Sequence, residues 1–79
     1  MITLDVYTDA VAITTSDTVD LAKVTDGIWV GGAGIVVAVF QNGRTANFTC
    51  VAGQLLPLRV KRVNATSTTA TLMVALYET

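Results

Sequence analysis

The chain has 79 residues and a formal net charge of −1, and 52% of its residues are hydrophobic while only 14% are charged. A chain this short forms a single domain, residues 1–79, that buries only about 60% of the surface its unfolded form exposes, so its surplus of apolar side chains needs cover from outside the monomer. With no histidine and one cysteine, an internal disulfide and a thiolate zinc cage are excluded, and the commonest general base is missing. We therefore expect a protein without enzymatic activity, cofactor or metal, and the near-neutral charge argues against nucleic acid as a partner.

Residues 1–10 alternate apolar and polar side chains, which is a strand pattern. Because terminal segments are often unanchored in a monomer, we expect them to serve as an assembly arm. No charged-then-apolar leader is recognisable here, which predicts synthesis and retention in the cytoplasm. Short strands are expected at 11–14 and 19–21, although 20–26 could instead form one helical turn.

The central stretch, 27–40, consists of two runs of β-branched and aromatic residues around Gly31, Gly32 and Gly34. We interpret it as the central hairpin, with these glycines as a structural turn in which at least one has positive φ. The second run is apolar on both strand faces, whereas an antiparallel strand usually has one solvent-exposed polar face. This pattern predicts that another subunit covers the second face.

The C-terminal half carries further strand and turn signals. Asn42 and Gly43 form the strongest hairpin signal and are predicted to join 36–40 to 45–51. Residues 54–63 are expected to form one long strand with Pro57 at an edge or bulge, and 72–77 a last strand that is apolar on both faces. The whole pattern predicts an all-β fold, a small antiparallel β-sandwich or barrel of about six to eight short strands that assembles into a ring.

Charge is unevenly distributed, because the chain is acidic up to Asp26 and basic after it. We expect the basic cluster to meet the acidic half of a neighbouring subunit, and we give a phosphate-contacting role for the same cluster less weight. The candidate subunit-contact residues are Trp29, Ile35, Val37, Val39, Arg59, Lys61, Arg62 and Tyr77.

Two other motifs invite a chemical interpretation. The glycine-rich run is unlike a phosphate-binding loop, because a strand pattern follows it and no lysine or serine comes directly after it. Asp17, Asp20 and Asp26 lack the spacing of a calcium-binding loop. Neither motif predicts a ligand site.

Several segments together resemble a known family. They are Ala-Ile-Thr-Thr-Ser-Asp at 12–17, Asp-Leu at 20–21, Gly-Ile-Trp-Val-Gly-Gly-Ala-Gly at 27–34, Ala-Gly-Gln-Leu-Leu-Pro-Leu-Arg-Val at 52–60 and Ala-Thr-Ser-Thr-Thr-Ala-Thr at 65–71. In this order they resemble the small head-spike base proteins of gene transfer agents and related tailed phages of alphaproteobacteria. The resemblance implies a virion structural protein that forms a ring on a capsid vertex and carries a fibre.

Three functions follow as hypotheses. The first is a non-enzymatic, pentameric spike base on the capsid exterior that links the major capsid protein to a spike fibre. The alternative is a trimeric capsid decoration protein, and the third is a host- or carbohydrate-binding module, which would need several exposed aromatic side chains. A membrane partner is not expected, because the longest apolar run falls short of the roughly 20 residues of a membrane span.

Overall fold

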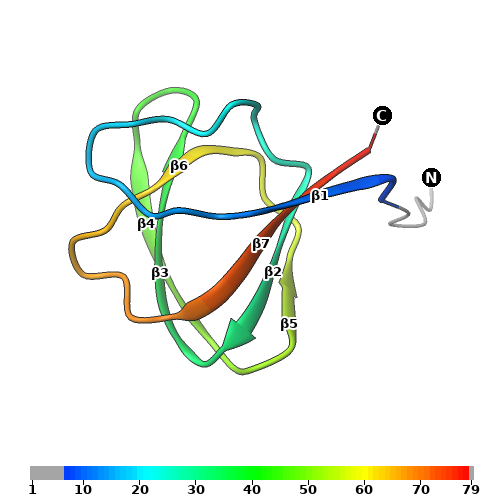
Figure 1. Ribbon diagram of the computed structural model, residues 1–79. Helices are drawn as coiled ribbons and strands as arrows, with labels where there is room; N and C mark the ends of the chain where they lie inside the picture. Colours follow the sequence, from blue (N-terminus) through cyan, green and yellow to red (C-terminus); the bar gives the residue numbers. More distant parts are fainter. Residues whose placement is uncertain (1–6, 79) are drawn as a thin grey trace.

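The computed structural model describes residues 7–78 and shows a sandwich of two antiparallel sheets (Figure 1). Sheet A has the strand order β1-β7-β2-β5, and sheet B has the order β4-β3-β6. The strands are β1 Asp9–Ala12, β2 Gly27–Gly32, β3 Gly34–Phe40, β4 Thr45–Cys50, β5 Gln54–Leu56, β6 Val60–Val63 and β7 Thr71–Tyr77. The predicted all-β sandwich is confirmed.

The core lies between the two sheets and is built by the alternation of side chains along each strand. Sheet A contributes inward-facing residues such as Ile28 and Val30, and sheet B contributes Val36 and Ala38, all of them fully buried. The remaining buried members of this cluster are Cys50, Leu56, Val60, Val63, Ala70 and Met73.

The predicted central hairpin is wrong. Strands β2 and β3 follow each other in the chain but belong to different sheets, since β2 pairs with β5 and β7 while β3 pairs with β4 and β6. Gly31 and Gly32 lie inside β2, and the chain crosses between the sheets at Ala33 and Gly34. The positive φ expected of one glycine is found at Gly34, at +153°. The crossing places the two apolar runs across the core from each other, so each buries a face without pairing to the other.

The hairpin predicted at Asn42 and Gly43 is confirmed. It joins β3 to β4, Gly43 has φ +87°, and the Gly43 N–H donates to the carbonyl of Phe40 at 2.9 Å. The Asn42 side chain accepts a hydrogen bond from the Arg44 N–H at 3.0 Å, as asparagine does in tight turns.

The long strand expected at 54–63 is divided in two. Strand β5 belongs to sheet A and β6 to sheet B, and the three residues between them, beginning with Pro57, carry the chain across the core. Pro57 has no N–H to donate to a ladder, so the strand ends there. Thr25 replaces the missing ladder contacts: its buried hydroxyl donates to the Leu58 carbonyl at 2.7 Å and accepts from the Val60 N–H at 3.1 Å.

The segment between β1 and β2 contains neither the strand predicted at 19–21 nor the alternative helical turn at 20–26. It lies along the outer edge of β6, where the N–H groups of Ser16, Leu21 and Thr25 donate to the carbonyls of Val63, Lys61 and Val60. These separated hydrogen bonds give carbonyl groups at the edge of β6 a partner without forming a continuous ladder. The segment therefore protects β6 from pairing with another chain.

At the N-terminus, the strand predicted at 11–14 is found slightly earlier, as β1. The expected assembly arm at 1–10 lies mostly outside the described residues, and its last two residues, Asp9 and Ala10, pair with β7.

The threonine-rich block at 64–71 extends the edge of β3 beyond the end of β6. The N–H groups of Ile35 and Val37 donate to the hydroxyls of Thr69 and Thr68, at 2.8 and 3.1 Å. The hydroxyls of the block thus accept hydrogen bonds that a neighbouring strand would otherwise accept.

Candidate subunit-contact surface

The outer face of sheet A is apolar. Trp29 is 43% exposed and stands directly opposite Val74 in β7 and Leu55 in β5, which places the three side chains on one face. We call the following set the apolar face: Ala10, Ala12, Trp29, Leu55, Leu72, Val74 and Leu76. None of these side chains carries a charge.

Leu72 is the most exposed large apolar residue of this face, at 78%. Its φ is +54°, in the left-handed region that leucine rarely adopts. Gly31 makes room for it, because a Cβ on Gly31 would lie 2.8 Å from the Leu72 Cβ. Sequence reasoning identified Trp29 but missed Leu72, Val74 and Leu76, although the two apolar faces of the last strand were the signal for them.

The β3 residues among the candidates lie on the opposite side of the sandwich from Trp29. Val37 and Val39 are only 7% and 1% exposed, so the single chain already covers them, and Ile35 is half-buried. Val39 stands opposite Thr45 and Arg62 in the neighbouring strands. The predicted set is therefore not one surface, and the valines offer little area to a partner.

Tyr77 is 4% exposed and is also covered within the chain. Its hydroxyl donates to the Lys23 carbonyl at 3.4 Å, and the Lys23 ammonium lies 4.5 Å from the centre of the ring. Burial raises the pKa of the Tyr77 hydroxyl, and the nearby carboxylates of Asp9 and Asp26 raise it further. The Tyr77 hydroxyl therefore stays neutral at physiological pH. Its buried ring packs at one end of sheet A.

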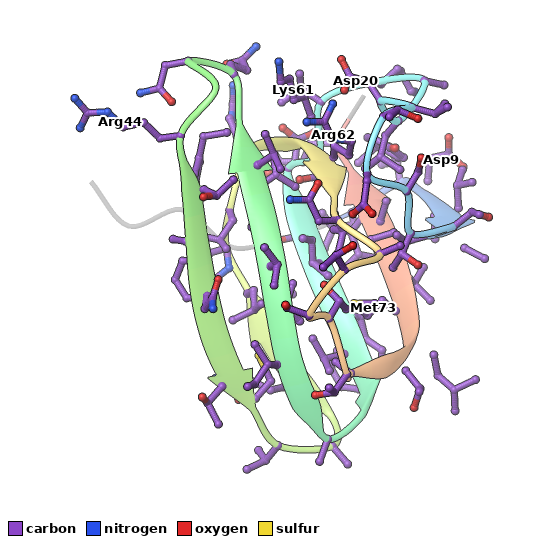
Figure 2. All side chains as sticks on the ribbon, turned by 90° about the vertical axis from the view of Figure 1, so that its left-hand side faces the viewer. Asp9, Asp20, Arg44, Lys61, Arg62 and Met73 are labelled. Atoms are coloured by element: carbon purple, nitrogen blue, oxygen red, sulfur yellow. The ribbon has the colours of Figure 1, made fainter. Side chains whose placement is uncertain are left out.

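Two residues of the basic cluster form ion pairs with acidic residues of the same molecule, whereas the charge pattern of the sequence predicts such contacts with a neighbouring subunit. The Arg62 guanidinium lies 2.8 Å from an Asp20 oxygen, and Arg59 lies 3.5 Å from Asp26. Folding brings the segment between β1 and β2 beside β6, and Figure 2 shows Asp20 and Arg62 close together.

Two cations of the described chain, Arg44 and Lys61, form no ion pair with another described residue. Arg44 lies at the tip of the β3–β4 hairpin, far from Arg62 in Figure 2.

Asp17 anchors the segment between β1 and β2 to the threonine-rich block. Its two carboxylate oxygens accept hydrogen bonds from the Thr66 N–H at 2.9 Å and the Thr66 hydroxyl at 2.5 Å. The bond from the Thr66 hydroxyl is the main reason that the pKa of Asp17 is lowered. The contact is structural, because the carboxylate is already occupied by its own chain.

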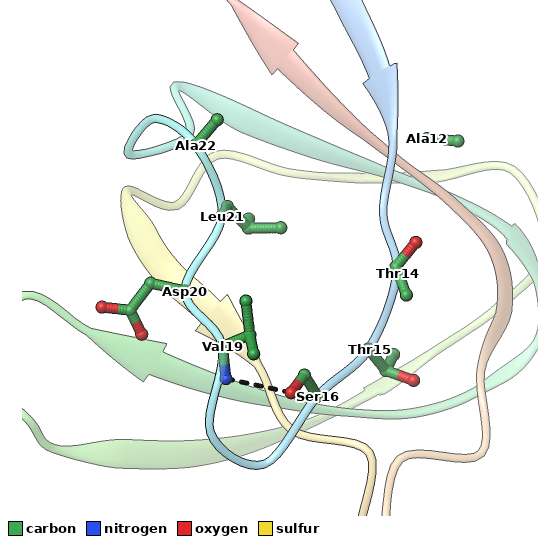
Figure 3. Close-up of a pocket in the computed structure, with 8 residues that line it drawn as sticks. All are labelled: Ala12, Thr14, Thr15, Ser16, Val19, Asp20, Leu21 and Ala22. Atoms are coloured by element: carbon green, nitrogen blue, oxygen red, sulfur yellow. Dashed lines mark hydrogen bonds between the residues drawn. The ribbon is translucent and has the colours of Figure 1, made fainter.

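A hollow of about 440 Å³ lies between the two arms of the segment that follows β1 (Figure 3). Its end is closed by the Val19 N–H, which donates to the Ser16 hydroxyl oxygen at 2.9 Å. It is lined by Ala12, Thr14, Thr15, Ser16, Val19, Asp20, Leu21 and Ala22. Asp20 is the charged residue of this lining and is already paired with Arg62, so the hollow brings no base and nucleophile together.

No metal site emerges from residues 7–78. Within that range no three His, Cys, Asp or Glu side chains are grouped so as to hold a metal ion. Burial raises the pKa of the Cys50 thiol, which keeps it protonated. No described helix is long and apolar enough to cross a membrane.

The fold and this surface define a small β-sandwich domain whose distinctive feature is an apolar sheet face. One chain of a solved structure, described as the capsid of a native GTA (gene transfer agent) particle computed with C5 symmetry, is 38% identical to this chain with a TM-score of 0.84. The match covers 89% of this chain and 82% of that one. The chain therefore belongs to the family of that GTA capsid-particle protein. A scan against protein-family models and a search of curated proteins give no match.

Proposed function

We propose that this protein is a non-enzymatic virion structural protein that forms the pentameric base of a spike on the capsid exterior. The observation that carries the proposal is the similarity, at 38% identity, to a chain from a capsid computed with C5 symmetry. Fivefold symmetry repeats every off-axis component five times, and a capsid vertex is where such an axis lies.

The pentamer would contact the major capsid protein on one side and a spike fibre on the other. The unpaired cations Arg44 and Lys61 support contacts to partners, because exposed charges steer association without being needed for the fold. Residues 1–10 would serve as an arm for assembly, and the protein would be made in the host cytoplasm. The alternative is a trimeric decoration protein, to which the similarity to a chain of a capsid particle applies equally.

Native mass spectrometry of the purified protein tests the stoichiometry. We expect a species of five chains of 8.3 kDa each, whereas a species of three chains would favour the decoration protein. Electron cryo-microscopy of particles produced with and without this protein tests its position. Extra density at fivefold vertices is expected, and density at threefold positions, or none, would overturn the proposal.

A further inference from the structure

We infer that the apolar face of sheet A is the surface through which one copy of the protein contacts the next. The inference rests on the proposed function and deepens it by assigning the contact to named residues. At its centre are Leu72, 78% exposed, and Trp29, 43% exposed.

Leu72 provides the strongest argument. At φ +54°, glycine or asparagine would be more stable than leucine. Within one chain the leucine side chain gains little in return, because most of it faces solvent. A strained backbone conformation at an exposed apolar residue is explained when a partner buries the side chain.

The size and chemistry of the face indicate which partner covers it. The strands of sheet A have 4, 7, 6 and 3 residues, which at roughly 3.3 Å per residue and about 4.8 Å between strands give an area of roughly 300 Å². That is less than half of the roughly 800 Å² that each partner contributes to a standard stable interface, so the face would form the centre of a larger contact. An uncharged apolar centre is typical of contacts between copies of one chain.

Fivefold closure also limits the form of the contact. In a ring each interface joins two different surfaces, so the apolar face meets another region of the neighbouring copy rather than the same face. One end of the face is already covered, because the Tyr7 ring stands over Gly27, with its hydroxyl oxygen 2.7 Å from where a Gly27 Cβ would lie. The other end, with Leu72, is the part left for a second copy.

Two substitutions separate association from folding. Leu72→Asn removes the apolar contact but suits the left-handed backbone, so the dilute monomer should melt at the same temperature or up to about 5 °C higher. Val74→Thr keeps the shape of the side chain on the same face. Each variant should raise the dissociation constant of the assembly, Leu72→Asn by about tenfold or more, as measured by analytical ultracentrifugation.

Val19→Asn is the matched control, because Val19 is 67% exposed and lies outside the apolar face. It should assemble like the parent. Equal weakening in Val19→Asn and Leu72→Asn, or unchanged assembly in Leu72→Asn and Val74→Thr, would overturn the inference.

A cross-link identifies the partner. Cys50 is 3% exposed, so in Leu72→Cys a benzophenone maleimide should label position 72 selectively. Photolysis of the assembled protein, followed by peptide mass spectrometry of the dimer band, should show position 72 joined to a different region of a second copy. Products joined only within one chain, or only to a capsid protein in intact particles, would contradict a contact between copies.

The two proposals fail in different ways. A parent protein that stays monomeric at high concentration, yet occupies fivefold vertices of particles, would overturn the contact between copies through this face and leave the vertex role standing. A parent that assembles through the apolar face but is absent from the vertices would overturn the vertex role and leave the contact between copies standing.

Discussion

The two outer faces of this sandwich are built from strands of similar composition, but their apolar side chains are buried to different extents. On sheet B the apolar residues Val37 and Val39 are covered by their own chain, and the exposed positions of β4 are Thr45, Asn47 and Thr49. On sheet A, Trp29 and Leu72 are exposed, and Val74 and Leu76 are half-buried. An apolar strand face is thus not evidence of an interface until its cover within the chain is known.

At the edges of sheet B, segments without regular structure act as covering segments. The segment between β1 and β2 places Asp20 beside Arg62, and the threonine-rich block satisfies the free edge of β3. Sheet A has no corresponding segment over Leu72 in the described chain. The difference predicts that damage to the covering segments lowers folding stability, whereas damage to the apolar face lowers assembly.

The largest effect is expected where the chain crosses between the sheets. A Cβ on Gly34 would lie 2.5 Å from the Ala70 backbone nitrogen and 2.7 Å from the Thr69 carbonyl carbon, at φ +153°. Because backbone atoms cannot move aside cheaply, Gly34→Val should cost about 3 kcal/mol or more and lower both the melting temperature and the fraction assembled. Thermal denaturation followed by circular dichroism measures the first, and sedimentation the second.

Gly43→Ala is the control for Gly34→Val. Gly43 also has positive φ, but a Cβ there would meet nothing within 4 Å, so its cost should be about 1 kcal/mol. Gly32→Val should fall between the two, because its Cβ would meet the rotatable Thr71 hydroxyl. Equal melting temperatures for Gly34→Val and Gly43→Ala would show that the crossing is loosely packed.

The next effect concerns the buried hydroxyl that supports β6. Thr25→Val keeps the side-chain shape but leaves the Leu58 carbonyl and the Val60 N–H without their partner. An unsatisfied group costs about 1–3 kcal/mol when buried, and Leu58 is only half-buried, so we expect a loss of roughly 2–4 kcal/mol in urea unfolding. Thr25→Ser retains the hydroxyl and should cost only about 1 kcal/mol. If serine is as damaging as valine, the lost methyl group and not the hydrogen bonds explains the effect.

The smallest effect distinguishes the paired cation from the free one. Arg62→Glu breaks the contact with Asp20 and removes a side chain that stands opposite Val39, so it should cost about 1 kcal/mol of folding stability. Lys61→Glu should change folding stability by less than about 0.5 kcal/mol. Lys61→Glu thereby provides the cleaner test of whether the basic cluster contributes to assembly at low salt. Arg62→Glu melting like Lys61→Glu would mean that the Asp20 pair does not stabilise the fold.

Local signals in the sequence were sufficient where a structural element depends on adjacent residues. The all-β class follows from β-branched runs separated by turn residues, and the β3–β4 hairpin follows from Asn42 and Gly43, whose backbone preferences act without distant partners. Trp29 was also a candidate for subunit contact, and the folded chain leaves it 43% exposed. The conformation of such a turn is set by the residues of the turn itself.

Tertiary structure alone decided which strands pair and which apolar faces are covered. Strands β2 and β3 looked like a hairpin, but β2 finds its partner in β7, far along the chain, because two sheets bury more apolar surface than one pair of strands. The pairing of Asp20 with Arg62 joins residues 42 positions apart and cannot be inferred from the charge of each half of the chain. Leu72 shows the same limit, since an alternating pattern assigns it to a face but only the folded backbone reveals its positive φ and its exposure.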